Sequence, residues 1–207
     1  MFTRFEAHFR RDAFAVSLEH TGGATKLNEP RLAELLREFG GVSFNGGLYR
    51  VMTENAVTLG NAFIACAFSQ YCERVMPFAY DWLGRLFAID CTRMEEGAPA
   101  ILMLEPGTGQ ALQIPCNLIS FHENELIEYG EEALAVTFYK QWIENGGDAP
   151  MQNQCVGYKK PLFLGGKDVC ENVEMVDLDV YWTITAQLIH KVRGLPSGTR
   201  IGKVDID

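Results

Sequence analysis

The sequence predicts an α+β fold: a single domain with a central, mainly antiparallel sheet flanked by helices, plus a short N-terminal helical extension. Two observations carry this prediction. Runs with strand-like composition are grouped in the middle of the chain, and runs with helical spacing lie before and after them. A regular alternation of strands and helices would instead predict a parallel, doubly wound sheet. The length of 207 residues fits one domain with a small appendage.

Three helices are predicted in the first part of the chain. The first covers residues 4–18, where apolar side chains share one face. The second follows Asn28 as its cap, has a proline in its first turn and ends at Gly40. The third covers residues 54–72 and is apolar on nearly all sides, so we expect it to be buried. The stripe of the second helix has i, i+3, i+4, i+7 spacing: Leu32, Leu35, Leu36 and Phe39.

Four strands are predicted next, as an antiparallel meander. Residues 78–80 and 86–89 flank a turn that holds Gly84. Residues 100–104 and 111–114 flank a loop with the letters EPGTGQ, which is rich in turn-forming residues. The two hairpins together give the central sheet.

Helices return in the last third of the chain. A capping box at Ser120 predicts a helix start at residue 121, and a second helical run follows it. Residues 155–164 can supply one more strand. Asp177 is then predicted to cap a long final helix that ends at Gly194.

The charge of the chain is acidic, with a formal net charge of -9 and a pI near 5.0. Such a surface repels phosphate backbones, so we expect no direct nucleic-acid binding and, instead, attraction of a basic partner. The simpler interpretation is that the acidity only maintains solubility. The acid is concentrated between residues 120 and 150, where a single base faces seven acids: Glu123, Glu125, Glu128, Glu131, Glu132, Glu144 and Asp148.

The location expected from the sequence is the cytoplasm. No apolar run approaches the ~18 residues that a membrane span needs, so no membrane partner is expected. The first residues contain no continuous apolar segment typical of a secretory signal. The six cysteines are scattered without a C-x-x-C pair, which fits reduced thiols better than disulfides or a zinc site.

The stretch LFLGGKD, residues 162–168, raises the possibility of a nucleotide-binding loop. A phosphate-binding loop requires a Ser or Thr after its lysine and a helix that starts at once. Here Lys167 is followed by Asp168, whose carboxylate would repel a phosphate. The glycines are therefore interpreted as a sharp exit from a strand, and no cofactor is expected.

No other motif predicts catalysis or metal binding. The acids Asp177 and Asp179 are explained by a helix start, where the macrodipole favours negative charge. The four histidines lack metal-ligand spacing, and His122 is expected to be an exposed residue at a helix start. No set of nucleophile, acid and base stands at a specific spacing, so the chain is predicted to be a binding protein without catalytic residues.

The turn Asp81–Trp82–Arg85 is a candidate contact site. Tryptophan and arginine are frequent anchors of protein interfaces. The alternative is that Trp82 folds back over the sheet as part of the core, and the sequence leaves both interpretations open.

Taken together and in order, several segments resemble a known family: FAYDWLGRLFAID, MLEPGTGQALQIP, FHENEL, CVGYKKPLFLGG, NVEMVDLDVYW and GLPSGT. Over residues 30 to 203, the chain resembles the C-terminal domain of the type VI secretion DNase-immunity family. The hairpin over residues 78–90 also resembles the SUKH superfamily of immunity proteins. Only a short N-terminal segment precedes the similar region, so residues 1–27 are expected to be a helical extension and residues 28–207 an immunity-type α+β domain.

The resemblance implies a bacterial protein that binds and blocks a protein toxin, an effector delivered between cells. The partner is expected to be basic and nuclease-type, because an acidic face can occupy a phosphate-binding cleft. The alternatives are a small hydrolase and a ligand-binding regulator, either of which requires a deep pocket. The predicted partner-binding residues are Asp81, Trp82, Arg85, Glu123, Glu125, Glu128, Glu131 and Glu132.

Overall fold

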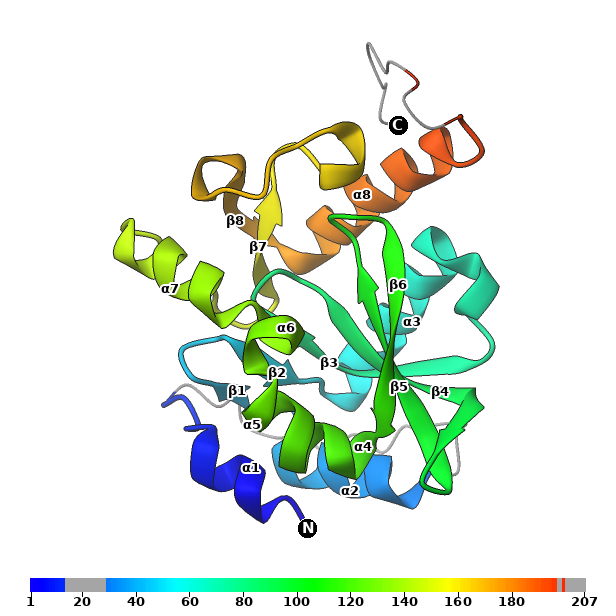
Figure 1. The fold of residues 1–207 in the computed structure, drawn as a ribbon, viewed down its shortest axis with the longest axis vertical. Helices are drawn as coiled ribbons and strands as arrows, with labels where there is room; N and C mark the ends of the chain where they lie inside the picture. Colours follow the sequence, from blue (N-terminus) through cyan, green and yellow to red (C-terminus); the bar gives the residue numbers. More distant parts are fainter. Residues whose placement is uncertain (14–28, 197–198, 200–207) are drawn as a thin grey trace.

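The computed structural model describes residues 1–13, 29–196 and 199. It confirms the predicted α+β class (Figure 1). The helices of the described part are α1 (Thr3–His8), α2 (Pro30–Phe39), α3 (Glu54–Ala67), α4 (Leu118–Ser120), α5 (Leu126–Glu128), α6 (Gly130–Leu134), α7 (Val136–Glu144) and α8 (Leu178–Val192). Its strands are β1 (Ser43–Phe44), β2 (Tyr49–Val51), β3 (Val75–Asp81), β4 (Leu86–Glu95), β5 (Ala98–Glu105), β6 (Gln110–Asn117), β7 (Gln154–Tyr158) and β8 (Val173–Asp177). Single turns of other helix types are η1 (Ser69–Tyr71), η2 (Phe121–Glu125), η3 (Leu162–Leu164) and η4 (Cys170–Asn172).

The central sheet is antiparallel throughout, with the strand order β1-β2-β3-β4-β5-β6. The predicted four-stranded meander is confirmed as β3 to β6. Gly84 has a φ of +74° in the β3–β4 turn, a conformation that favours glycine. Strands β1 and β2 were not predicted, because each is too short to show an alternating pattern. Strands β7 and β8 form a separate two-stranded sheet.

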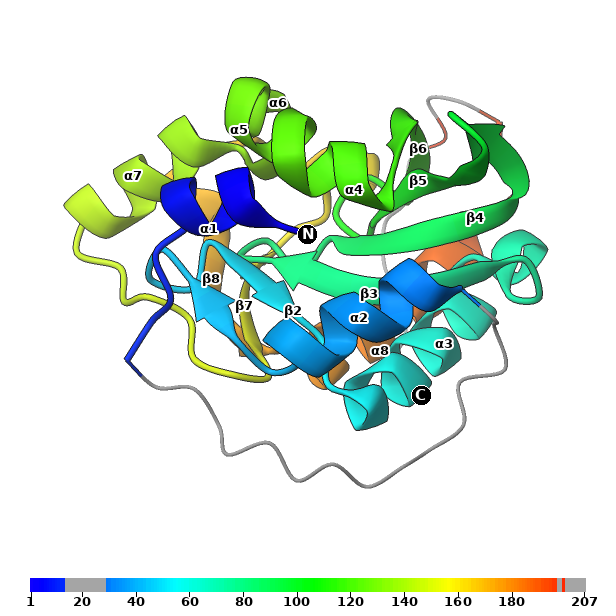
Figure 2. The same ribbon diagram turned by 90° about the horizontal axis from the view of Figure 1, so that it is seen from below.

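Helices cover both faces of the central sheet (Figure 2). Helices α3 and α8 pack together on one face, where Phe63 and Trp182 stack with ring centroids 5.6 Å apart. The segment from α4 to α6 covers the other face. The middle strands are therefore shielded on both sides, and all seven residues of β3 are buried. This burial explains why these strands are continuous apolar runs.

The N-terminal segment is part of the core. Phe5 is fully buried, and its ring lies 4.7 Å from Phe9, 4.9 Å from Phe44 and 5.0 Å from His122. The predicted helix over residues 4–18 is too long: α1 ends at His8, after which Phe9 is extended. Residues 14–18 of that prediction lie outside the described residues. The amide of Asp12 then bonds the carbonyl of Ser43, so the chain runs beside β1 after the helix.

Other helix boundaries also differ from the prediction. Glu29 caps α2 by accepting from Arg31 N, and the predicted cap Asn28 lies outside the described residues. The predicted capping box at Ser120 is wrong, because Asn117 caps α4 instead and accepts from two amides. The strand predicted over residues 155–164 ends at Tyr158.

Because Phe5 is central to the aromatic core, we expect Phe5→Ala to reduce the free energy of unfolding by roughly 3–5 kcal/mol. Ala7 is exposed on the same helix, so Ala7→Ser should change it by less than about 0.5 kcal/mol. Urea unfolding followed by circular dichroism measures both. An unchanged midpoint for Phe5→Ala would show that α1 does not contribute to the fold.

Candidate protein-interaction surface

The surface that carries most of the predicted glutamates is built on a π-helical turn, η2, between α4 and α5. Such turns insert one extra residue per helical turn and often occur at functional sites. Phe121 and His122 both point into the core, although they are consecutive. The next two residues, Glu123 and Asn124, therefore turn toward α1.

His122 is the first correction to the predicted surface. It was expected to be exposed, but its ring is fully buried. Nδ1 lies 2.8 Å from the carbonyl oxygen of Leu118, and Nε2 lies 2.9 Å from the hydroxyl of Tyr49. A neutral imidazole satisfies both contacts by donating to the carbonyl and accepting from the hydroxyl. Burial lowers the pKa of His122 to about 4.

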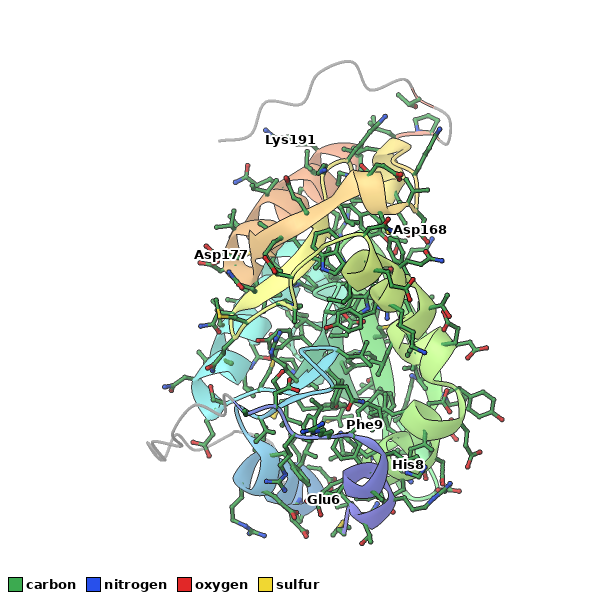
Figure 3. The ribbon with its side chains drawn as sticks, turned by 90° about the vertical axis from the view of Figure 1, so that its left-hand side faces the viewer. Glu6, His8, Phe9, Asp168, Asp177 and Lys191 are labelled. Carbon is green, nitrogen blue, oxygen red and sulfur yellow. The ribbon has the colours of Figure 1, made fainter. Side chains whose placement is uncertain are left out.

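Glu123 binds the N-terminal helix rather than facing outward. One of its carboxylate oxygens accepts from the amides of Arg4 at 3.0 Å and Phe5 at 3.1 Å. These are the first free amides of α1, where a carboxylate is favoured by the helix dipole. The guanidinium of Arg4 also pairs with Glu128 at 3.1 Å. Figure 3 shows α1 at one end of the molecule, with Glu6, His8 and Phe9 labelled.

Glu131 also has a role within the fold. Its carboxylate accepts from the amide of Thr137 at 2.9 Å and from the hydroxyl of the same residue at 2.7 Å. Thr137 lies in the first turn of α7, which begins after Ala135 in a left-handed conformation with φ +50°. Glu131 therefore stabilises the break between α6 and α7, which the sequence pattern did not reveal.

Glu125 and Glu132 remain available to a partner. Within residues 1–13 and 29–196, neither side chain makes a hydrogen bond or a salt bridge. Partial burial raises the pKa of Glu125, and the nearby carboxylates of Glu132 and Glu128 raise it further. We call Glu125, Glu128 and Glu132 the acidic ridge. The mutual repulsion of its carboxylates would be relieved by a cationic partner.

The turn Asp81–Trp82–Arg85 is the main correction to the predicted contact site. All three side chains are buried, so they cannot contact a partner in this structure. The Nε of Arg85 donates to Asp81 at 2.6 Å, and Asp81 also accepts from the amides of Leu83 and Arg85. Of the two interpretations of Trp82, the structure shows the core position. Sequence spacing could not distinguish them because both place the tryptophan in a turn.

This buried turn joins the sheet to the helical segment. Arg85 Nη2 donates to the carbonyl of Ala133 at 2.9 Å, and Trp82 Nε1 donates to the carbonyl of Leu134 at 2.8 Å. Both carbonyls lie at the end of α6. The side chains thus satisfy backbone acceptors that the helix break leaves free.

The glycine loop over residues 162–168 is closed by its own chain. Residues 162–164 form the turn η3 instead of the predicted strand, and the amides of Gly165 and Gly166 donate to Leu162 and Pro161. A β-carbon on Gly166 would lie 1.9 Å from the carbonyl oxygen of Lys160, which explains the glycine. These amides are occupied, so the loop does not present them to a phosphate.

Asp168 also has an internal partner. It accepts from the hydroxyl of Tyr158 at 2.7 Å, at the end of the molecule far from α1 (Figure 3). Among the described residues, no group of three or more His, Cys, Asp or Glu is placed to hold a metal ion. No helix in the described ranges is long and apolar enough to span a membrane.

The comparisons with known proteins bear on the segment that carries the acidic ridge. Residues 118–189 match the family described as T6SS immunity protein Tdi1, C-terminal. The matched segment begins at α4 and ends within α8, and it covers about a third of the chain. The predicted resemblance to a type VI immunity family is confirmed over these residues.

The fold as a whole also has a solved counterpart. The crystal structure of Atu4351 from Agrobacterium tumefaciens matches with a TM-score of 0.59 and 16% sequence identity. The match covers 90% of this chain and 89% of that one, so the shared fold extends well beyond residues 118–189. No curated protein matches the chain significantly. The relation to the SUKH superfamily stays a prediction.

The lowered pKa of His122 predicts a loss of stability in acid. In the unfolded chain, histidine titrates near its ordinary pKa of about 6.5. Between pH 6.5 and 4 the unfolded state therefore binds more protons, and the free energy of unfolding falls as the pH is lowered, by up to about 3 kcal/mol. His122→Gln should flatten this dependence, even if it lowers stability at every pH. Urea titrations at several pH values measure the slopes, and equal slopes would exclude this role.

Removal of Asp81 should affect stability, because it leaves Arg85 buried without its carboxylate. We expect Asp81→Ala to reduce the free energy of unfolding by roughly 3–5 kcal/mol. Glu144→Ala, at an exposed position of α7, is the control and should change it by less than about 0.5 kcal/mol. Thermal or urea unfolding measures both. A destabilisation no greater than that of the control would mean that the buried pair contributes little.

Proposed function

We propose that this chain is an immunity protein that neutralises an effector of a type VI secretion system by binding it stoichiometrically. The observation that carries the proposal is the family match over residues 118–189, which covers the acidic ridge. A binding role, in place of catalysis, is supported by the way the fold uses several of its buried polar side chains. Asp81, Arg85 and His122 are three of them, and each is bonded to the chain itself.

In this proposal the effector is basic and of nuclease type, and this chain binds it in the cytoplasm. The net charge of -9 favours a basic partner, because opposite charges accelerate encounter and disfavour wrong partners. The acidic ridge provides the local negative potential, since Glu125 and Glu132 have no cation of their own in the described chain. A nuclease cleft shaped for a phosphate backbone would accept such a row of carboxylates.

The contact surface that we propose contains fewer residues than the set predicted from the sequence. Glu125, Glu128 and Glu132 form its centre. Glu123 and Glu131 contribute indirectly, since they hold α1 and α7 in place around it. We leave Asp81, Trp82 and Arg85 out of the proposed contact because they are buried.

The first test is co-purification of the tagged chain with the catalytically inactivated product of the neighbouring reading frame. We expect a one-to-one complex with a basic protein that dissociates at high salt. Recovery of the chain alone, under conditions in which the candidate is soluble, would contradict direct neutralisation of that effector.

Charge reversal then tests the acidic ridge. We expect the double variant Glu125→Lys, Glu132→Lys to lower the association rate constant by about tenfold and to weaken its salt dependence, because electrostatic steering is lost. Stopped-flow or surface plasmon resonance with the inactive effector measures both quantities.

The matched control for this test is the double variant Glu171→Lys, Glu174→Lys. It makes the same change in net charge, at exposed positions near β8. If both double variants slow association equally, only net charge matters and the ridge has no special role. If neither slows it, the ridge is not the contact.

A further inference from the structure

We propose that the outer edge of β6 binds an extended, basic segment of the effector as an additional strand of the central sheet. This inference rests on the proposed function, since it names the element of this chain that receives the partner. The added strand would extend the order β1 to β6 by one. Main-chain hydrogen bonds supply affinity in this mode of recognition, and alternate side chains supply specificity.

The two edge strands of the central sheet differ in whether another part of the described chain pairs with their outer side. The β1 edge is covered by the chain itself: Arg11 bridges Phe44, the amide of Asp12 bonds Ser43, and the amide of Asn45 bonds Arg10. At the other edge, β6 pairs with β5, and no strand of the described chain pairs with its outer side. An edge of this kind presents unpaired amide and carbonyl groups, which are a template for another strand.

The part of β6 suited to pairing is residues 110–114. These five residues pair in regular register with β5, from Gln110 opposite Glu105 to Ile114 opposite Ile101. Beyond them the register shifts, and Pro115 has no amide hydrogen to donate. Prolines and bulges protect sheet edges from pairing. Because only the end at Pro115 is protected in this way, residues 110–114 leave about 17 Å of regular edge for a partner.

The side chains along this segment are exposed where those of the inner strands are buried. Gln110, Leu112 and Gln113 are exposed, whereas every residue of β3 is buried. The side chain of Leu112 is 41% exposed, which is unusual for a leucine in the main sheet of this protein. An apolar residue of an added strand could pack against it as a cross-strand neighbour.

The charge around β6 selects the partner. The pKa of the Cys116 thiol is raised, first by burial and then by the nearby carboxylates of Glu125, Glu95 and Glu96. The nearby cation Arg93 has the opposite effect and lowers this pKa. Glu96 is fixed in position by Asn117 at 3.1 Å and Ser120 at 3.0 Å. One end of the edge therefore continues into the acidic ridge through Glu125. A segment with lysine or arginine at that end fits this arrangement, and an acidic segment does not.

Amide hydrogen exchange of the full chain, alone and with the inactive effector identified by co-purification, tests the proposal. We expect the amides within residues 110–114 that point away from β5 to exchange at least tenfold more slowly in the complex. Amides of α3 serve as the internal reference and should not change, because α3 lies on the face of the sheet opposite the segment from α4 to α6. Protection limited to the acidic ridge would overturn the added-strand proposal.

A pair of substitutions gives an independent measurement. Leu112→Ser should weaken binding of the inactive effector by about tenfold, as expected for loss of one apolar contact at an interface. Leu59→Ser removes a leucine that is 45% exposed on α3 and should leave the affinity unchanged. Equal affinities for both variants would count against β6. Both side chains are partly exposed, so circular dichroism should show both variants folded.

The outcomes distinguish this inference from the function on which it rests. If no complex forms, the proposed function fails, and the partner strand fails with it. If a tight complex forms without protection of residues 110–114, the function stands and only the β6 proposal falls. Protection in the isolated chain that grows with concentration would identify a second copy as the occupant. Protection independent of concentration would identify another part of the same chain as the occupant. Either result would also overturn the proposal.

Discussion

The π-helical turn Phe121–Glu125 is the constraint on which the candidate surface depends. It turns His122 inward, to bonds with Tyr49 and Leu118, and it turns Glu123 toward the first amides of α1. In a regular helix, consecutive side chains are separated by a constant angle. Such a helix would be less suited to direct His122 into the core and Glu123 toward α1. The acidic ridge begins at Glu125, the last residue of this turn, so its position on the surface is set by these interactions of His122 and Glu123.

A second connection ties the helical segment to the sheet. The β3–β4 turn places Asp81, Trp82 and Arg85 under the end of α6, where Arg85 and Trp82 satisfy the carbonyls of Ala133 and Leu134. These contacts join the family-matched segment to residues that lie before it in the chain. The matched segment is therefore not packed as an independent unit, since its helix ends depend on side chains from the central hairpin.

Much of the fold could be predicted from the sequence, because long elements have regular patterns. Helix α2 has its apolar stripe where it was expected, and the β3–β6 meander follows from two turn-rich loops. Short or irregular elements could not be predicted. Strands β1 and β2 have too few residues for a period, and the left-handed Ala135 breaks a helix without glycine or proline.

The site was harder to predict than the fold, for a physical reason. A glutamate that caps a distant helix and a glutamate that faces solvent look alike in a sequence. Glu123 and Glu125 illustrate this: the first binds α1, and the second remains unpaired in the described chain. The burial of Trp82 and His122 likewise depends on contacts with residues far along the chain. Charge pattern made this segment the candidate, and only tertiary structure distinguished the glutamates with internal partners from those without them.

The anchoring of α1 has a consequence for synthesis of the protein in the cell. The residue that caps this helix, Glu123, follows Arg4 by 119 positions. At translation rates of roughly 5–20 residues per second, the ribosome adds the cap on the order of ten seconds after the helix. During that interval Phe2, Phe5 and Phe9 have no completed core to enter. The nascent chain therefore presents an aromatic segment that a holding chaperone would recognise, and α1 joins the fold late although it is made early.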